Sequence, residues 1–271
     1  MSITRLVFPK APATEAPCAR TPAGTALLLV AHGVGGGPGI AASHAVELRR
    51  LGLYDEVAVA CLKGMPSIEA ALRQIRSPQV LVLPLLMSNG YSYGSILQVQ
   101  LLQHSARHEI ALRQPLGLHP RLADAAEAMA AQTCLEHGWR QDTTTVIIAG
   151  HGTSQSAQSR DSAISLAGQL RQRRRFGDVS AAFLSDTPRL EFALSDLGDR
   201  KAVVVGLFAD RGTHGETDLD RLIDGSDANI AYAGPIGCSP RILELIFEIA
   251  SRAPGCSTVN RMEGEPVRSP E

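Results

Sequence analysis

The 271-residue chain contains an internal duplication, and this feature limits its possible folds more than any other. Residues 145–242 repeat the landmarks of residues 25–122 in the same order and at nearly the same spacing. The matching pairs, with offsets of 119, 122, 122 and 120 residues, are His32 and His151, Pro66 and Pro188, Pro84 and Gly206, and Pro115 and Pro235. A repeat this long indicates a duplicated domain, because solenoid repeats span only about 20–50 residues.

Each copy has the pattern of strands alternating with helices. Apolar runs predict strands over 26–31, 56–62, 80–86, 109–112, 145–149, 179–184, 202–208 and 229–232. Helical spacing predicts helices over 41–51, 67–75, 120–134, 164–175, 189–197, 218–224 and 240–250. A further helix is predicted to start near residue 95. Continuous Val, Leu and Ile strands between helices are typical of parallel sheets covered on both faces. We therefore predict an α/β protein of two duplicated domains, each a four-stranded parallel sheet with helices on both faces.

The domain boundaries follow from the ends of the repeat. We expect one domain over residues 25–140, a second over 141–253, and flexible tails over 1–24 and 254–271. The N-terminal tail mixes Pro, Ala, Thr and charged residues without an apolar stretch, which argues against a secretory signal.

Composition excludes several classes of partner. A net charge of −1 argues against a general nucleic-acid binder. The five cysteines are scattered and form no CxxC motif, which suits a reducing cytoplasm and gives no thiolate metal site. The longest apolar runs have strand length, far below the roughly 20 residues of a membrane span. We expect a cytoplasmic monomer or homodimer without nucleic-acid or membrane partners.

Two histidines follow strands of the second copy. His151 follows the strand at 145–149, and His214 follows the strand at 202–208 after a glycine-bearing loop. Ligands of parallel sheets bind at the carboxyl ends of the strands, and two imidazoles there can hold a divalent first-row metal with positions left open. Glu216, two residues beyond His214, could accept protons or contact the metal. The alternative is that each histidine is an ordinary polar loop residue.

With these motifs the sequence resembles the class II chelatases of the sirohydrochlorin type, the CbiX/SirB group, which insert a divalent metal into a modified tetrapyrrole. Gly150-His151-Gly152-Thr153 matches the family's Ala-His-Gly-(Ser/Thr) strand end. Residues 206–219 match a later part of the family pattern, in which a strand leads into a Gly-Gly-His loop followed by acidic residues. Residues 114–121 and 234–241 match a third family motif, Gly-Pro-Leu-Gly-x-His-Pro-Arg. The resemblance covers about residues 25–250, and the order of the motifs, twice over, gives it specificity.

The resemblance implies two halves facing each other across one cleft, and a tetrapyrrole substrate. It also implies a divalent metal substrate, cobalt or iron with nickel as a further option, and no permanently bound cofactor. His151 and His214 would bind the metal and act in catalysis with Glu216. The residues expected to bind substrate are His32, Tyr91, Tyr93, Arg121 and Arg241.

The first copy departs from the family pattern. It keeps His32, but Tyr91 or Ser92 stands where the family has its second histidine, and the acidic residues that follow are missing. In the third motif, His119 of the first copy corresponds to Ser239 of the second. We therefore predict that the second half carries the chemistry and the first half forms the cleft wall. A non-catalytic metallochaperone or tetrapyrrole-binding paralogue is the competing interpretation.

Other patterns have ordinary interpretations. Residues 37–42 fit G-x-G-x-x-A, but the next strand ends Cys61-Leu62-Lys63 without the acidic residue that dinucleotide binding needs. The glycines at 35–39 instead indicate a loop where the backbone approaches something closely or moves. The basic run 171–175 is typical of a solvated helix end, with attraction of a polycarboxylate as the alternative. Arg121 and Arg241 could equally serve the structure of the repeated turn.

Overall fold

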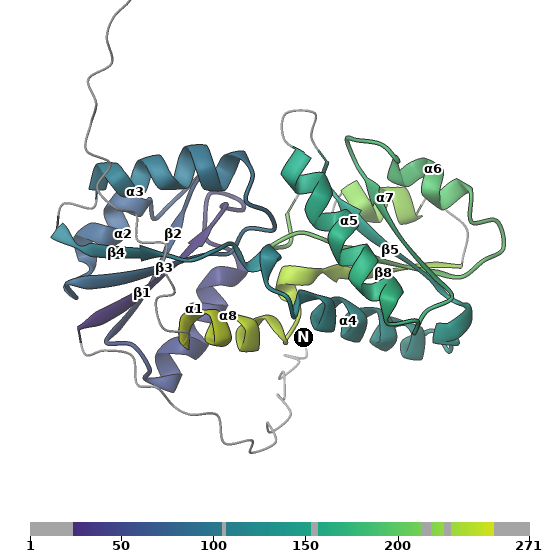
Figure 1. Ribbon diagram of the computed structural model, residues 1–271, viewed down its shortest axis with the longest axis horizontal. Helices are drawn as coiled ribbons and strands as arrows, with labels where there is room; N and C mark the ends of the chain where they lie inside the picture. The colour runs from purple at the N-terminus through teal and green to yellow at the C-terminus, as the bar shows by residue number, and fades with distance from the viewer. Residues whose placement is uncertain (1–23, 105–106, 153–156, 213–217, 225–228, 252–271) are drawn as a thin grey trace, which may run out of the picture.

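The computed structural model describes residues 24–104, 107–152, 157–212, 218–224 and 229–251 (Figure 1). Residues 254–271 and nearly all of the N-terminal tail lie outside the described residues. The same is true of two predicted site residues, His214 and Glu216.

The described elements alternate between strands and helices, as predicted. The first half contains β1 (Thr25–Ala31), α1 (Ile40–Leu51), β2 (Glu56–Cys61), α2 (Ile68–Gln74), β3 (Gln79–Pro84), a π-helical segment (Ser92–Leu97) leading into α3 (Gln98–His104), β4 (Glu109–Leu112) and α4 (Leu122–Glu136). The second half contains β5 (Thr145–Gly150), α5 (Ala157–Gln172), β6 (Asp178–Phe183), α6 (Leu190–Ser195), β7 (Ala202–Gly206), α7 (Asp218–Asp224), β8 (Ile230–Pro235) and α8 (Ile242–Ser251).

The two sheets have the same topology, which confirms the duplication. Their strand orders are β2-β1-β3-β4 and β6-β5-β7-β8, and all pairs are parallel. Val30 pairs with Pro84 in the first sheet, and Ala149 pairs with Gly206 in the second. The residues that follow Ala31 and Gly150, His32 and His151, therefore occupy equivalent positions.

The central strands end slightly earlier than the apolar runs suggest. β3 and β7 stop at Pro84 and Gly206, two residues before the predicted ends. The carbonyls of Leu86 and Phe208 instead accept hydrogen bonds from Gly117 N and Gly237 N, both at 2.9 Å. Each strand end is thus tied to the glycine of the third repeated motif, which spans residues 115–121 in the first half and 235–241 in the second.

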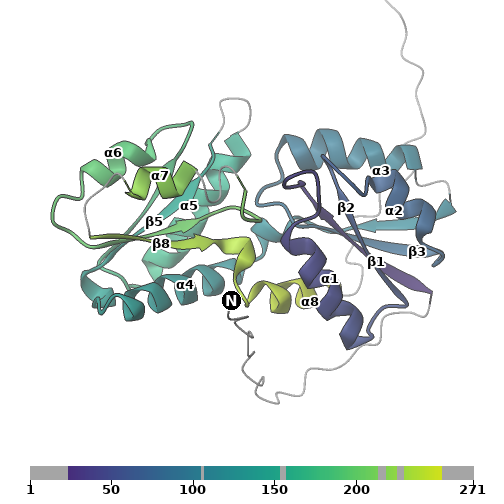
Figure 2. The same ribbon diagram turned by 180° about the vertical axis from the view of Figure 1, so that it is seen from behind.

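The last helix of each half packs against the sheet of the other half. α4 lies against β7, β8 and α5, whereas α8 lies against β3, next to α1 (Figures 1 and 2). We call this arrangement the helix exchange. The predicted domain boundary between residues 140 and 141 stays a prediction about the sequence repeat. The packing crosses this boundary, because α4 covers the second sheet and α8 covers the first.

Apolar side chains on the inner faces of both sheets form one continuous core. It includes Leu29 of β1, Ile148 of β5, Ala126 of α4 and Ile246 of α8, all fully buried. Burial of this area is the main favourable contribution to folding. Because the exchanged helices belong to this core, separating the halves would expose it to water.

The outer face of each sheet is covered by its own helices. Leu28 of β1 belongs to a cluster under α2 and α3, and Ile147 of β5 belongs to a cluster under α6 and α7. Covering on both faces was predicted from the continuous apolar strands. None of the helices in the described ranges is both long and apolar enough to cross a membrane.

Candidate functional site

His151 stands at the carboxyl edge of the second sheet, directly after its central strand β5. The backbone there is fixed on both sides. Ser185 N donates to the carbonyl of His151 at 2.8 Å, and Leu207 N donates to Ala149 at 2.7 Å. The side chain is half-buried. The strand end thus holds an imidazole on a rigid element, as a binding site requires.

The chain continues from β7, the neighbour of β5, toward His214. It is described as far as Gly212 and resumes at Asp218, the first residue of α7. The adjacency of β5 and β7 agrees with the prediction that both histidines leave one edge of the sheet. The meeting of the two imidazoles, and the part played by Glu216, stay predictions.

The loop toward His214 is tied to the first half through Asp210. Its Oδ2 accepts a hydrogen bond from Ile40 N, at the start of α1, over 2.6 Å. Gly39 precedes α1 with φ +54°, and a Cβ there would lie 1.7 Å from the same oxygen. A carboxylate at a helix N-terminus satisfies a free N–H and complements the helix dipole. Of the two alternatives for the glycine loop, close approach or movement, Gly39 shows the close approach.

A second link between the halves forms beside Asp210. His44 Nε2 of α1 lies 3.3 Å from the carbonyl oxygen of Gly237. Gly237 in turn packs against the backbone before Asp210, since a Cβ on it would lie 2.0 Å from Ala209 O. The third repeated motif thus supports the loop that leads to His214, which explains why it contains a glycine.

This second link should make the protein less stable in mild acid. Burial lowers the pKa of His44 below 6.5, and the Gly237 carbonyl and Asp210 only partly oppose this. The stabilising effect of neutral His44 is fully present above about pH 6.5 and decreases as pH falls below it, because the unfolded chain then binds the proton more readily. Urea unfolding at pH 7.5 and 5.5 should show a smaller pH-dependent loss for His44→Gln than for the wild type. Equal losses would contradict the assignment.

The first half presents a more open arrangement at the equivalent edge. His32 is exposed, and its carbonyl accepts a hydrogen bond from Lys63 N at 2.9 Å. Tyr91 is 65% exposed. Tyr93 instead packs against the outer core cluster of its own sheet, and its hydroxyl donates to Arg113 O at 3.3 Å. Burial raises the pKa of the Tyr93 hydroxyl. Of the two tyrosines, Tyr91 is the more accessible to a ligand.

Arg121 is part of a charged network across the helix exchange. Its guanidinium forms ion pairs with Glu248 of α8 and, at 2.9 Å, with Asp124 of α4. Arg173, from the basic run, reaches Asp124 at 2.7 Å and Glu127 at 3.0 Å. These contacts support the structural alternative for Arg121.

The third motif differs between the halves in the same region. His119 is buried, and its Nε2 lies 3.5 Å from Glu248. Arg241, the counterpart of Arg121, is exposed, and its backbone N–H donates to Ser239 Oγ at 3.4 Å. Arg241 therefore remains the better candidate of the two arginines for contact with a ligand.

A metal centre cannot be assembled from the described residues alone. Across residues 24–104, 107–152, 157–212, 218–224 and 229–251, no three His, Cys, Asp or Glu side chains are grouped closely enough to hold an ion. The predicted pair of His151 and His214 requires a residue outside these ranges.

Comparison with known proteins gives matches over both halves. The CbiX family model matches residues 26–133 and 145–253. A probable sirohydrochlorin cobaltochelatase from Halobacterium salinarum is 26% identical in an alignment 269 positions long that covers 84% of this chain and 91% of that protein.

Several solved structures are similar to this one. DR2241 from Deinococcus radiodurans, a multi-domain protein with structural similarity to chelatases, matches 86% of this chain with a TM-score of 0.71 and 25% identity. This chain spans only 55% of that protein. SirB from Bacillus subtilis with Fe³⁺ matches 83% of this chain and 94% of its own length, with a TM-score of 0.72 and 17% identity. At 17% identity, the similarity to SirB shows a shared fold alone.

Proposed function

Because this chain belongs to the CbiX family, we propose that it is a metal chelatase that inserts Co²⁺ or Fe²⁺ into sirohydrochlorin or a related tetrapyrrole. The observation that carries the proposal is the match of the family model to both halves, with the histidine pair kept in the second. The name of the Halobacterium relative supports the same substrate. The reaction would belong to cobalamin or sirohaem biosynthesis in the cytoplasm.

The proposed chemistry exchanges two protons for one metal ion. The macrocycle loses two pyrrole protons as M²⁺ binds its four nitrogens. His151 and His214 would bind the incoming metal or accept a pyrrole proton, and both tasks need neutral imidazole. Glu216 would accept a proton or orient His214. Insertion should therefore slow at acidic pH.

The first half would provide the opposite wall of a cleft that binds and bends the macrocycle. His32 and the exposed Tyr91 are suited to this role, whereas Tyr93 is partly committed to its own sheet. Imidazole ligands accept cobalt, iron and nickel, so geometry and supply would select the metal. The metal is a substrate in this scheme, and the protein would act as a monomer or homodimer.

A turnover assay should separate this proposal from its competitor. The incomplete motif of the first half favours, as second candidate, a non-catalytic metallochaperone or tetrapyrrole-binding paralogue. Metal-free protein mixed with excess sirohydrochlorin and Co²⁺ or Fe²⁺ is followed by absorbance. We expect conversion of many equivalents of substrate per protein. A spectral change that stops at one equivalent would identify a binding protein instead.

A further inference from the structure

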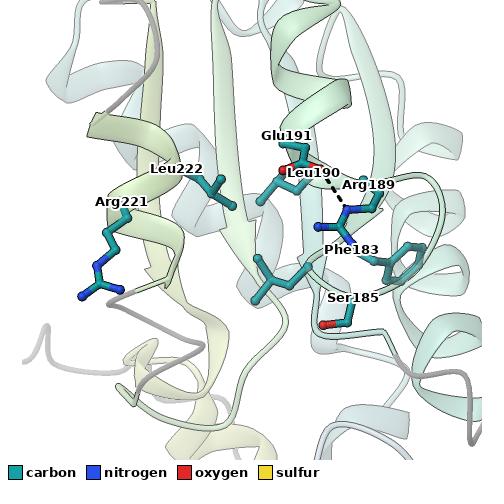
Figure 3. A pocket seen from close by; sticks show the side chains of 8 residues that line it. Phe183, Ser185, Arg189, Leu190, Glu191, Arg221 and Leu222 are labelled. Atoms are coloured by element: carbon teal, nitrogen blue, oxygen red, sulfur yellow. Dashed lines mark hydrogen bonds and ion pairs between the residues drawn. The ribbon is translucent and has the colours of Figure 1, made fainter.

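A cavity of about 320 Å³ lies at the carboxyl edge of the second sheet, where the loop after β6 faces α7 (Figure 3). The apolar wall is formed by Leu184, Leu190 and Leu222, which belong to or pack against the outer core cluster of the second sheet. Arg189 lies at its rim beside Glu191. A cavity with an apolar wall and a cationic group is suited to a ligand with methylene groups and a carboxylate.

The Arg189 side chain is directed toward the middle of the cavity (Figure 3). Its Nε bonds Glu191 Oε1 at 3.0 Å, and both side chains are 44% exposed. Such exposed ion pairs contribute little to stability. Among the described residues, no partner contacts the two terminal guanidinium nitrogens, which carry the N–H groups that bind carboxylates in pairs.

The duplication shows that Arg189 is an unfavourable residue for its local structure. Its counterpart is Ser67, since each forms the isolated bridge with the last residue of the preceding edge strand. Ser67 Oγ caps α2 by accepting Ala70 N at 3.1 Å, whereas Arg189 gives α6 no side-chain cap. A cation at a helix N-terminus also opposes the helix dipole. A role in binding accounts for an arginine at this position.

The cavity adjoins the candidate site through the backbone. Ser185, which lines the cavity, donates its N–H to the carbonyl of His151 at 2.8 Å. A ring bound at His151 could therefore extend a side arm toward Arg189. Sirohydrochlorin carries carboxylate arms around its ring, each on one or two methylene groups, which matches the chemistry of the cavity.

We propose that this cavity binds one carboxylate arm of the tetrapyrrole, with Arg189 contacting the carboxylate and the apolar wall contacting its methylene groups. The proposal rests on the proposed function. It makes Arg189 a substrate-binding residue that sets affinity and orientation. A free small carboxylate would satisfy the same chemistry and is the alternative source.

The test compares Arg189→Ser and Arg189→Lys with the wild type in sirohydrochlorin metal insertion. Arg189→Ser installs the counterpart residue and can cap α6, so the fold should be kept. Loss of a charge-assisted hydrogen bond should raise KM about 10-fold to 100-fold with little change in kcat. The KM of Arg189→Lys should lie between those of the wild type and Arg189→Ser, because lysine keeps the charge but lacks the paired donors. Arg140→Ser is the matched control, since Arg140 is an exposed, ion-paired arginine just before β5.

Three further outcomes are decisive. A methyl ester of the substrate should remove the difference between the wild type and Arg189→Ser, and a difference that persists would overturn the proposal, as would an unchanged KM. Competitive inhibition by succinate that Arg189→Ser abolishes, with KM for sirohydrochlorin unchanged, would assign the cavity to a free carboxylate. If the wild type binds sirohydrochlorin without turnover, the proposed function fails, and the Kd of the same variants then tests Arg189.

Discussion

Replacing His151 with alanine should lower kcat/KM for metal insertion by about 10²- to 10⁴-fold, the usual contribution of a group that transfers protons. His214→Ala should have a similar effect, because a divalent ion is labile on a single imidazole. His32→Ala should cost much less. His32 occupies the equivalent strand end in the first half, but Tyr91 or Ser92 replaces the partner histidine there.

Steady-state kinetics of the alanine variants would decide which half carries the catalytic site. His137→Ala is a suitable control, since His137 is an exposed residue that ends α4 and stacks beside Trp139. Tyr91→Phe should mainly raise KM. A larger loss at His32 than at His151 would place the working site in the first half, with Tyr91 or another group in place of the missing histidine.

The sheets could be predicted because the signal that specifies them is local. Buried parallel strands are continuous apolar runs, and the duplication gives each run twice. The helices were predicted less well where they face water. α5 starts at Ala157, seven residues before the predicted start, because its first two turns are mostly exposed polar residues without an apolar stripe.

The helix exchange could not be predicted from the same patterns. An apolar stripe on α4 shows which face is buried, but it does not show which of two similar sheets the helix covers. The ion pair of Arg121 with Glu248 joins residues 127 positions apart, and no local spacing reveals it. The exchange was therefore missed, and with it the evidence that Arg121 holds helices together.

Asp210 was missed for the same reason. In the sequence it is one polar residue in the loop toward His214, and its partner Ile40 lies 170 residues away. The available signal was Gly39, which indicated a close approach without saying to what. The pairing gives Asp210 a positioning role, because it anchors the His214 loop on the first half.

The Gly39→Ala substitution should therefore lower both stability and activity strongly. The new Cβ would collide with the Asp210 carboxylate, so the hydrogen bond to Ile40 must break, and φ +54° is unfavourable for alanine. The backbone strain costs about 1–2 kcal/mol and the lost charge-assisted bond about 1.5–3 kcal/mol. We expect the free energy of unfolding to fall by roughly 3–5 kcal/mol, with kcat/KM reduced because the displaced loop leads to His214.

A double-mutant cycle separates the two contributions. Gly35 also has a positive φ, +57°, with open space around it, so Gly35→Ala is a control for replacing a positive-φ glycine of this loop without a collision. In an Asp210→Ala background the collision is absent, and Gly39→Ala should then cost less than it does in the wild type, leaving the backbone strain at position 39. The coupling between positions 39 and 210 should exceed about 1 kcal/mol in urea unfolding. Additive effects would mean that Asp210 does not hold the start of α1, and the His214 loop would have to be positioned by other contacts, such as that between Gly237 and Ala209.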